Sequence, residues 1–132
     1  MRFLFFPIIL LFVFSCDTPT PKKCPDLVFE DNITRSNGRL YTGRCATYRN
    51  DTLRSVQQYI NGKDHGKWTF FFSNGDIETS GKFSNGQRVG KWKYYYSNGN
   101  IKQISRYRDG EKYGNWLNYD ENGKLILKVK HS

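Results

Sequence analysis

Residues 90–101 read GKWKYYYSNGNI, and residues 66–77, which lie 24 positions earlier, read GKWTFFFSNGDI. A third copy of the Gly-x-Trp motif follows after another 24 positions, at residues 114–116. A fixed period of a few tens of residues indicates an array of structural repeats, so the fold is best interpreted one unit at a time.

Two series of turn-forming pairs have the same 24-residue period. The first series is Asn37-Gly38, Asn61-Gly62, Asn85-Gly86 and Asp109-Gly110, and the second is Asn50-Asp51, Asn74-Gly75, Asn98-Gly99 and Asn122-Gly123. Asn-Gly favours the type I′ turn of β-hairpins, because both central residues of that turn need a positive φ. Each unit therefore contains two predicted turns and two predicted strands, and the units are residues 37–60, 61–84, 85–108 and 109–132.

The segments between the turns have the composition of β-strands. Aromatic and β-branched residues dominate the predicted first strands (67–72 and 91–96) and second strands (76–83 and 100–107). No sustained helical stripe of apolar residues occurs after residue 20. The sequence thus predicts an all-β fold, an antiparallel meander of about eight strands in one elongated sheet, with Trp, aromatic and aliphatic side chains stacking like on like across it.

Alternation along the strands places aromatic residues on both faces of this sheet. Trp68, Trp92 and Trp116 share one face, whereas Phe71, Tyr95 and Tyr119 point to the other. One interpretation is that the Trp row is simply the packed face of the array. The other is that an aromatic strip stays open and binds proteins or glycans, as exposed Tyr and Trp do well. These six residues are the candidate binding residues.

The first residues are interpreted as an export signal. Arg2 precedes an apolar run at 3–14, which fits a signal peptide (residues 1–15, helical) better than a membrane-spanning helix, since spanning requires about 20 apolar residues. Residues 13–16 read VFSC and resemble the lipobox of bacterial lipoproteins. The resemblance implies cleavage before Cys16 and attachment of a diacylglyceryl group and an amide-linked acyl chain such as palmitate, which together suffice for stable anchoring.

By this interpretation the mature chain begins with a lipidated Cys16 and a short Pro- and Lys-bearing tether (16–23), followed by an N-terminal cap segment (24–36). The expected location is the bacterial cell envelope, with the inner or outer membrane undetermined. Once Cys16 carries lipid, Cys24 and Cys45 remain as an even pair in an oxidising compartment. We predict a disulfide between them, which would contribute on the order of 3 kcal/mol, with two free buried thiols as the alternative.

The chain is strongly basic, with 21 Lys and Arg against 12 Asp and Glu and a formal net charge of +9. The basic residues are spread along the predicted strands and not concentrated in one run: Lys67, Lys82, Lys91, Lys93, Lys102, Arg106, Lys128 and Lys130. They form either a solvated face whose lysines discourage edge pairing or a surface that attracts lipid headgroups, an anionic cell-wall polymer or an acidic protein. An exported chain is not expected to meet nucleic acid.

The repeat unit in residues 66–77 and 90–101 resembles the MORN-type repeat, in the variant found in bacterial proteins described as YwqK-family antitoxins of toxin–antitoxin systems. The resemblance covers residues 37–132. It implies hairpin-built scaffolds that bind proteins, dimerise or approach membranes. No set of toxin-neutralising residues accompanies it, so an antitoxin or immunity role is kept as an alternative.

The sequence contains no recognisable catalytic constellation, phosphate loop or metal-spaced cluster. His65 lies in a predicted turn and His131 near a chain end expected to fray. We therefore expect no enzymatic activity, no metal and no cofactor. The predicted function is a membrane-anchored, non-catalytic scaffold for a protein partner at the envelope, with a glycan- or wall-binding module as the main alternative.

Overall fold

The computed structural model describes residues 22–132, and these residues form thirteen β-strands. The signal peptide, Cys16 and most of the tether lie outside the described residues. Three short strands make a small sheet: β1 (Leu27–Glu30), β2 (Ile33–Ser36) and β3 (Arg39–Leu40). The other ten form one large sheet: β4 (Gly43–Arg49), β5 (Thr52–Ile60), β6 (Lys63–Asp64), β7 (Gly66–Phe71), β8 (Ile77–Ser84), β9 (Gln87–Tyr95), β10 (Ile101–Arg108), β11 (Glu111–Lys112), β12 (Gly114–Tyr119) and β13 (Leu125–His131).

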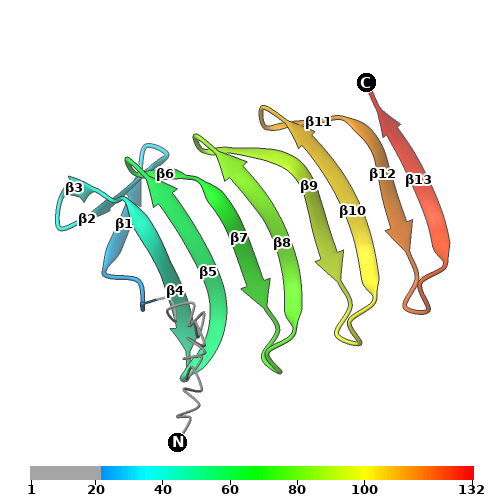
Figure 1. Ribbon diagram of the computed structural model, residues 1–132, viewed down its shortest axis with the longest axis horizontal. Helices are drawn as coiled ribbons and strands as arrows, with labels where there is room; N and C mark the ends of the chain where they lie inside the picture. The colour runs from blue at the N-terminus through cyan, green and yellow to red at the C-terminus, as the bar shows by residue number, and fades with distance from the viewer. Residues whose placement is uncertain (1–21) are drawn as a thin grey trace, which may run out of the picture.

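The large sheet is an elongated antiparallel meander, as Figure 1 shows. Its strand order, β13-β12-β10-β9-β8-β7-β5-β4, follows the chain from one end to the other, while β6 and β11 pair with β5 and β10. The predicted all-β meander is confirmed, and the strand ends at β7 and β8 fall within one residue of the prediction. No helix long and apolar enough to span a bilayer occurs among residues 22–132.

The glycine of the Gly-x-Trp motif bends each first strand. Gly66, Gly90 and Gly114 have φ values of 63°, 68° and 63°, a left-handed conformation that glycine adopts without a steric penalty. In two units the bend separates a two-residue strand from the longer one, as in β6 and β7, whereas β9 runs through it. The three units are therefore variants of one hairpin.

The two series of turns differ in type. In the first series both central residues have positive φ, for example 52° at Asn85 and 84° at Gly86, which confirms the type I′ prediction. In the second series only the glycines Gly75, Gly99 and Gly123 have positive φ, together with the Asn50-Asp51 pair of the first unit. The type I′ prediction is therefore wrong for the three Asn-Gly pairs of the second series.

The reason lies in the longer loop between the paired strands. Gly75 N–H donates to the Phe72 carbonyl at 3.0 Å, and Gly99 and Gly123 donate to Tyr96 and Asp120 at the same distance. Such a loop needs one left-handed residue after its tight turn, and glycine supplies it. The preceding Asn instead uses its side chain, since the Asp76 N–H donates to Asn74 Oδ1 at 3.1 Å.

Cross-strand pairing defines the two faces of the sheet. Trp68 lies opposite Gly81, Trp92 opposite Ser105 and Trp116 opposite Val129. On the reverse face one row crosses all eight main strands, and its members are Ala46, Val56, Thr69, Ser80, Lys93, Ile104, Leu117 and Lys128. The first face is called the ladder face and the second the basic face.

The core is a continuous row of rings on the ladder face. Neighbouring ring centroids lie between 4.7 and 6.4 Å apart along the series Tyr41, Tyr59, Trp68, Phe83, Trp92, Tyr107, Trp116 and His131. The sequence predicts separate ladders of like residues, but the structure merges them into one. Each Trp lies between the Phe or Tyr of the unit before and the ring of its own unit, which is Phe83, Tyr107 or, for Trp116, His131. His131 belongs to this row, which corrects the expectation of a frayed position.

The N-terminal end of the sheet is covered. The small sheet lies beside the β4–β6 end of the array (Figure 1). Residues 22–24 pair with β4, since the Cys24 N–H donates to the Ala46 carbonyl and the Ala46 N–H to the Lys22 carbonyl, both at 2.8 Å. The outer edge of β4 therefore has hydrogen-bond partners.

Candidate interaction surfaces

The Trp residues of the ladder are mostly core residues. Trp68 is 8 % exposed and Trp92 is 1 % exposed, while Trp116 is half-buried. The indole N–H of each donates to a backbone carbonyl ten residues earlier, that of Gln58, Lys82 or Arg106, at 2.9 to 3.2 Å. Trp68 and Trp92 thus cannot offer a ring to a ligand, and their assignment as binding residues is corrected: the adjacent unit covers them.

Cations lie over the outer part of the ladder. The Arg88 guanidinium carbon is 4.5 Å from the centre of the Trp92 ring system and 5.4 Å from that of Tyr107, and the Lys112 ammonium is 4.7 Å from that of Trp116. These cation–π contacts shield the rings from solvent. These contacts could not be predicted from the sequence, although Arg88 and Lys112 share one repeat position.

The second repeat has an acidic residue, Asp64, at the position that Arg88 and Lys112 occupy in the later repeats. Its negative charge lies near the Tyr59 hydroxyl of the ladder. Burial raises the pKa of Asp64 above its usual range. Burial, with a contribution from the nearby Asp64 carboxylate, raises the pKa of Tyr59 to about 12. The Tyr59 hydroxyl donates to Gln57 Oε1 at 2.8 Å, so the neutral phenol is held in place.

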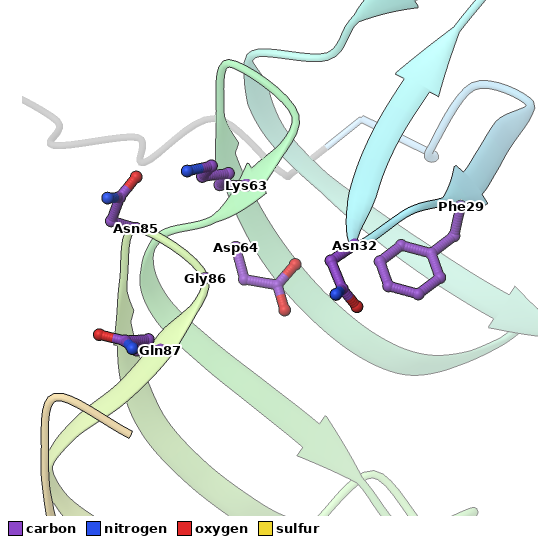
Figure 2. A pocket seen from close by; sticks show the side chains of 7 residues that line it. All are labelled: Phe29, Asn32, Lys63, Asp64, Asn85, Gly86 and Gln87. Atoms are coloured by element: carbon purple, nitrogen blue, oxygen red, sulfur yellow. The ribbon is translucent and has the colours of Figure 1, made fainter. Parts of the chain in front are cut away.

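Asp64 also lines a cleft between the small sheet and the first turns of the array (Figure 2). The cleft has a volume of about 620 Å³ and is lined by Phe29, Asn32, Lys63, Asp64, Asn85, Gly86 and Gln87. It offers one carboxylate and one ammonium group among amides. Within residues 22–132 there is no group of three or more His, Cys, Asp or Glu side chains that could hold a metal ion.

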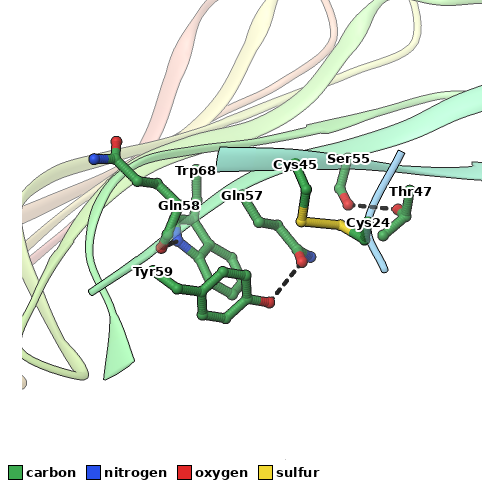
Figure 3. Close-up of a disulfide and its surroundings, with 8 residues drawn as sticks. All are labelled: Cys24, Cys45, Thr47, Ser55, Gln57, Gln58, Tyr59 and Trp68. Atoms are coloured by element: carbon green, nitrogen blue, oxygen red, sulfur yellow. Dashed lines mark hydrogen bonds between the residues drawn. A yellow bond between two sulfur atoms is a disulfide. The ribbon is translucent and has the colours of Figure 1, made fainter. Parts of the chain in front are cut away.

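The disulfide joins the cap to the array. Cys24 and Cys45 are bonded, as the sequence predicts, with their Cα atoms 4.7 Å apart. Cys45 is 1 % exposed and belongs to the cluster that contains Tyr59 and Trp68 (Figure 3). The bond therefore fixes residues 22–24 at the edge of β4 and closes the N-terminal end of the ladder.

The candidate residues Phe71, Tyr95 and Tyr119 form a different row. Each is the last residue of its strand, is half-buried, and lies opposite an aliphatic residue, namely Ile77, Ile101 and Leu125. Alternation from Phe70, Tyr94 and Asn118 places them on the basic face. This row remains partly accessible, unlike the buried Trp residues.

The basic face pairs like charges across strands. Lys67 lies directly opposite Lys82, and Lys91 lies directly opposite Arg106. Lys93, Lys128 and Lys130 lie opposite uncharged residues on the same face. Glu78 is the only acidic residue in strands β7, β8, β9, β10, β12 and β13. Opposed like charges destabilise a sheet, so this surface is electrostatically suited to an anionic partner.

A profile of the family described as MORN repeat variant matches the chain in three places, residues 64–85, 88–109 and 112–131. Each match contains one Gly-x-Trp motif, one second-series turn and the strand after it. No curated protein matches the chain. The second half of this chain is therefore similar to MORN repeat variants in three successive segments, which span the large sheet from β6 to β13.

Proposed function

We propose that the protein is a lipid-anchored, non-catalytic scaffold of the bacterial cell envelope that presents its basic face to an acidic protein partner. The opposed pairs Lys67–Lys82 and Lys91–Arg106 are the observation that carries the proposal. An array that served only as a packed spacer would gain stability from alternating charges at these positions. A partner that supplies the missing negative charge would remove the repulsion on binding.

The proposed anchor and the fold are compatible in length. Residue 22 already pairs with β4, so a lipid on Cys16 would be six residues away from the sheet. Six extended residues span at most about 20 Å. The β4 end of the array would therefore lie close to the membrane surface, and the later repeats would extend away from this attachment point.

Photo-crosslinking in native membranes tests the protein partner. A photoreactive amino acid is placed at Lys82 on the basic face or, as the matched control, at Thr79 on the ladder face of the same strand β8. We expect a protein adduct from position 82 and little from position 79. Equal adducts at both positions, or none at position 82, would contradict the proposal.

A Cys16→Ser variant tests the anchor separately and should be released from the membrane fraction.

The row of Phe71, Tyr95 and Tyr119 favours a glycan- or wall-binding module as the second candidate. Half-buried aromatic rings at regular intervals provide stacking surfaces for sugar rings. Retention of the protein on purified peptidoglycan or surface polysaccharide tests this candidate. Tyr95→Ala should reduce retention, whereas Phe29→Ala, which removes an exposed aromatic ring on the small sheet, should not. Absence of retention at low salt would eliminate it.

A further inference from the structure

The two outer edges of the large sheet differ. The edge of β4 is closed by residues 22–24 and fixed by the Cys24–Cys45 disulfide. In the described part of the chain β13 pairs with β12 alone, so its outer edge has backbone groups without a neighbouring strand. Several of its side chains are well exposed, including Ile126 at 61 % and Leu127 at 54 %. An open edge with exposed apolar residues is a template for an added strand.

The side chains of β13 are unsuited to packing against a further repeat of the same kind. In the interior units the residue two positions before the ladder Phe or Tyr is small, Gly81 or Ser105, and Trp92 packs so closely on Gly81 that a Cβ there would overlap the indole. In β13 the same position is Val129, 37 % exposed. The branched side chain occupies the space that the Trp of a following repeat would need. The edge of β13 is therefore unsuited to another unit of the same kind.

The side chains of β13 also indicate which kind of added strand its outer edge would accept. Leu127 and Val129 lie on the ladder face, where the interior strands have Thr79 or Gln103 and Gly81 or Ser105. Lys128 and Lys130 lie on the basic face, and β13 contains no acidic residue. A complementary strand would place apolar residues of small or branched shape beside Leu127 and Val129. It would place acidic residues beside the two lysines.

We propose that the outer edge of β13 binds an extended segment of a protein partner, in which acidic residues alternate with small or branched apolar residues, as an added β-strand. This inference rests on the proposed function and specifies where and how part of the partner binds. A second copy of β13 is a poorer occupant, because its own lysines would join an edge that already carries Lys128 and Lys130 without an acidic counterpart.

The test uses the protein without its signal peptide and a fluorescent peptide, matched in length to β13, in which Glu alternates with Val. We expect saturable binding by fluorescence anisotropy and slower hydrogen exchange of β13 amides. Lys128→Glu should weaken binding about tenfold, because it replaces an attraction by a repulsion. Arg44→Glu is the matched control, an exposed cation on the same face of β4 at the other end of the sheet, and should have little effect.

Two further peptides make the result specific. A peptide with Pro at its central position should not bind, because backbone pairing is interrupted, and a Lys–Val peptide should bind the Lys128→Glu variant better than the Glu–Val peptide does. The inference is overturned if the Pro peptide binds equally well, if Arg44→Glu weakens binding as much as Lys128→Glu, or if β13 is protected instead by self-association. A cross-linked partner at position 82 together with any of these results would leave the proposed function standing and remove only the edge site.

Discussion

Gly81 shows how one residue determines the packing of the ladder. Its φ does not lie in the left-handed region, so the backbone itself would accept other residues. The constraint is steric, because three indole carbons of Trp92 lie within 2.6 Å of the position a Cβ would take. Glycine is therefore required at position 81 because the Trp92 indole leaves no room for a Cβ, and not because of its conformational freedom.

A Gly81→Ala substitution tests this constraint. We expect it to destabilise the protein by about 1–3 kcal/mol, since overpacking forces Trp92 or the strand to move. The urea midpoint and the Trp fluorescence spectrum measure the effect. Ser80→Ala, on the basic face of the same strand, is the control and should change the midpoint little. Equal urea midpoints for Gly81→Ala and the wild type would show that the ring row accommodates the methyl group without loss of stability.

Tyr59 gives a second residue-scale prediction, on pH. Its pKa is raised to about 12 in the folded protein, above the unfolded value of 10.0, because burial and the Asp64 carboxylate disfavour the phenolate. The folded state thus retains the proton more strongly. This contribution to stability is complete below pH 10 and is lost as the pH rises towards 12.

A urea titration at several pH values measures this dependence. Between pH 10 and 12 the free energy of unfolding of Tyr59→Phe should fall less steeply than that of the wild type, because the variant lacks this phenol. The variant loses the hydrogen bond to Gln57, which lowers its stability at neutral pH by about 1 kcal/mol. An equally steep loss in both proteins would assign the alkaline transition to other groups, such as lysines.

Among the elements, the strands and first-series turns could be predicted because they depend on local rules. Alternation assigned Trp92 and Tyr95 to opposite faces, and the pair Asn85-Gly86 indicated its own turn type. Whether Trp68 belonged to the packed face or to an open strip could not be decided from the sequence, because its burial depends on Phe83 and Tyr59 from neighbouring strands. The small sheet could not be predicted either, because its strands β1 and β2 precede the first predicted unit.

The pairing of residues 22–24 with β4 is an element-scale feature that the disulfide should maintain. The bond closes a separation of 21 residues, so its removal in a Cys24→Ser, Cys45→Ser variant should cost about 3 kcal/mol. Hydrogen exchange should locate the loss at the Ala46 amide, whose carbonyl partner is that of Lys22. Unchanged protection of this amide after reduction would mean that the edge is held without the disulfide. The amides of β10 provide the internal control.

At the scale of the whole molecule, one face provides stability and the other tolerates repulsion. The ladder face contains a continuous row of rings from Tyr41 to His131. The basic face retains opposed cations in neighbouring units, the Lys67–Lys82 and Lys91–Arg106 pairs. A structure stabilised mainly through one face leaves the other available for a surface selected for binding and not for stability.

Lys82→Glu separates these two roles in one substitution. Replacing the repulsion with Lys67 by an attraction should raise the free energy of unfolding by about 0.2–1 kcal/mol. The gain should be largest at low ionic strength, because salt screens exposed charges. With the photoreactive amino acid placed instead at Lys93 on the same face, the same variant should give less cross-linked partner, since it loses positive charge there. Lys63→Glu, outside the opposed pairs, is the control for a general change of net charge. A variant that is both less stable and equally well cross-linked would mean that the opposed lysines neither repel each other nor recruit the partner.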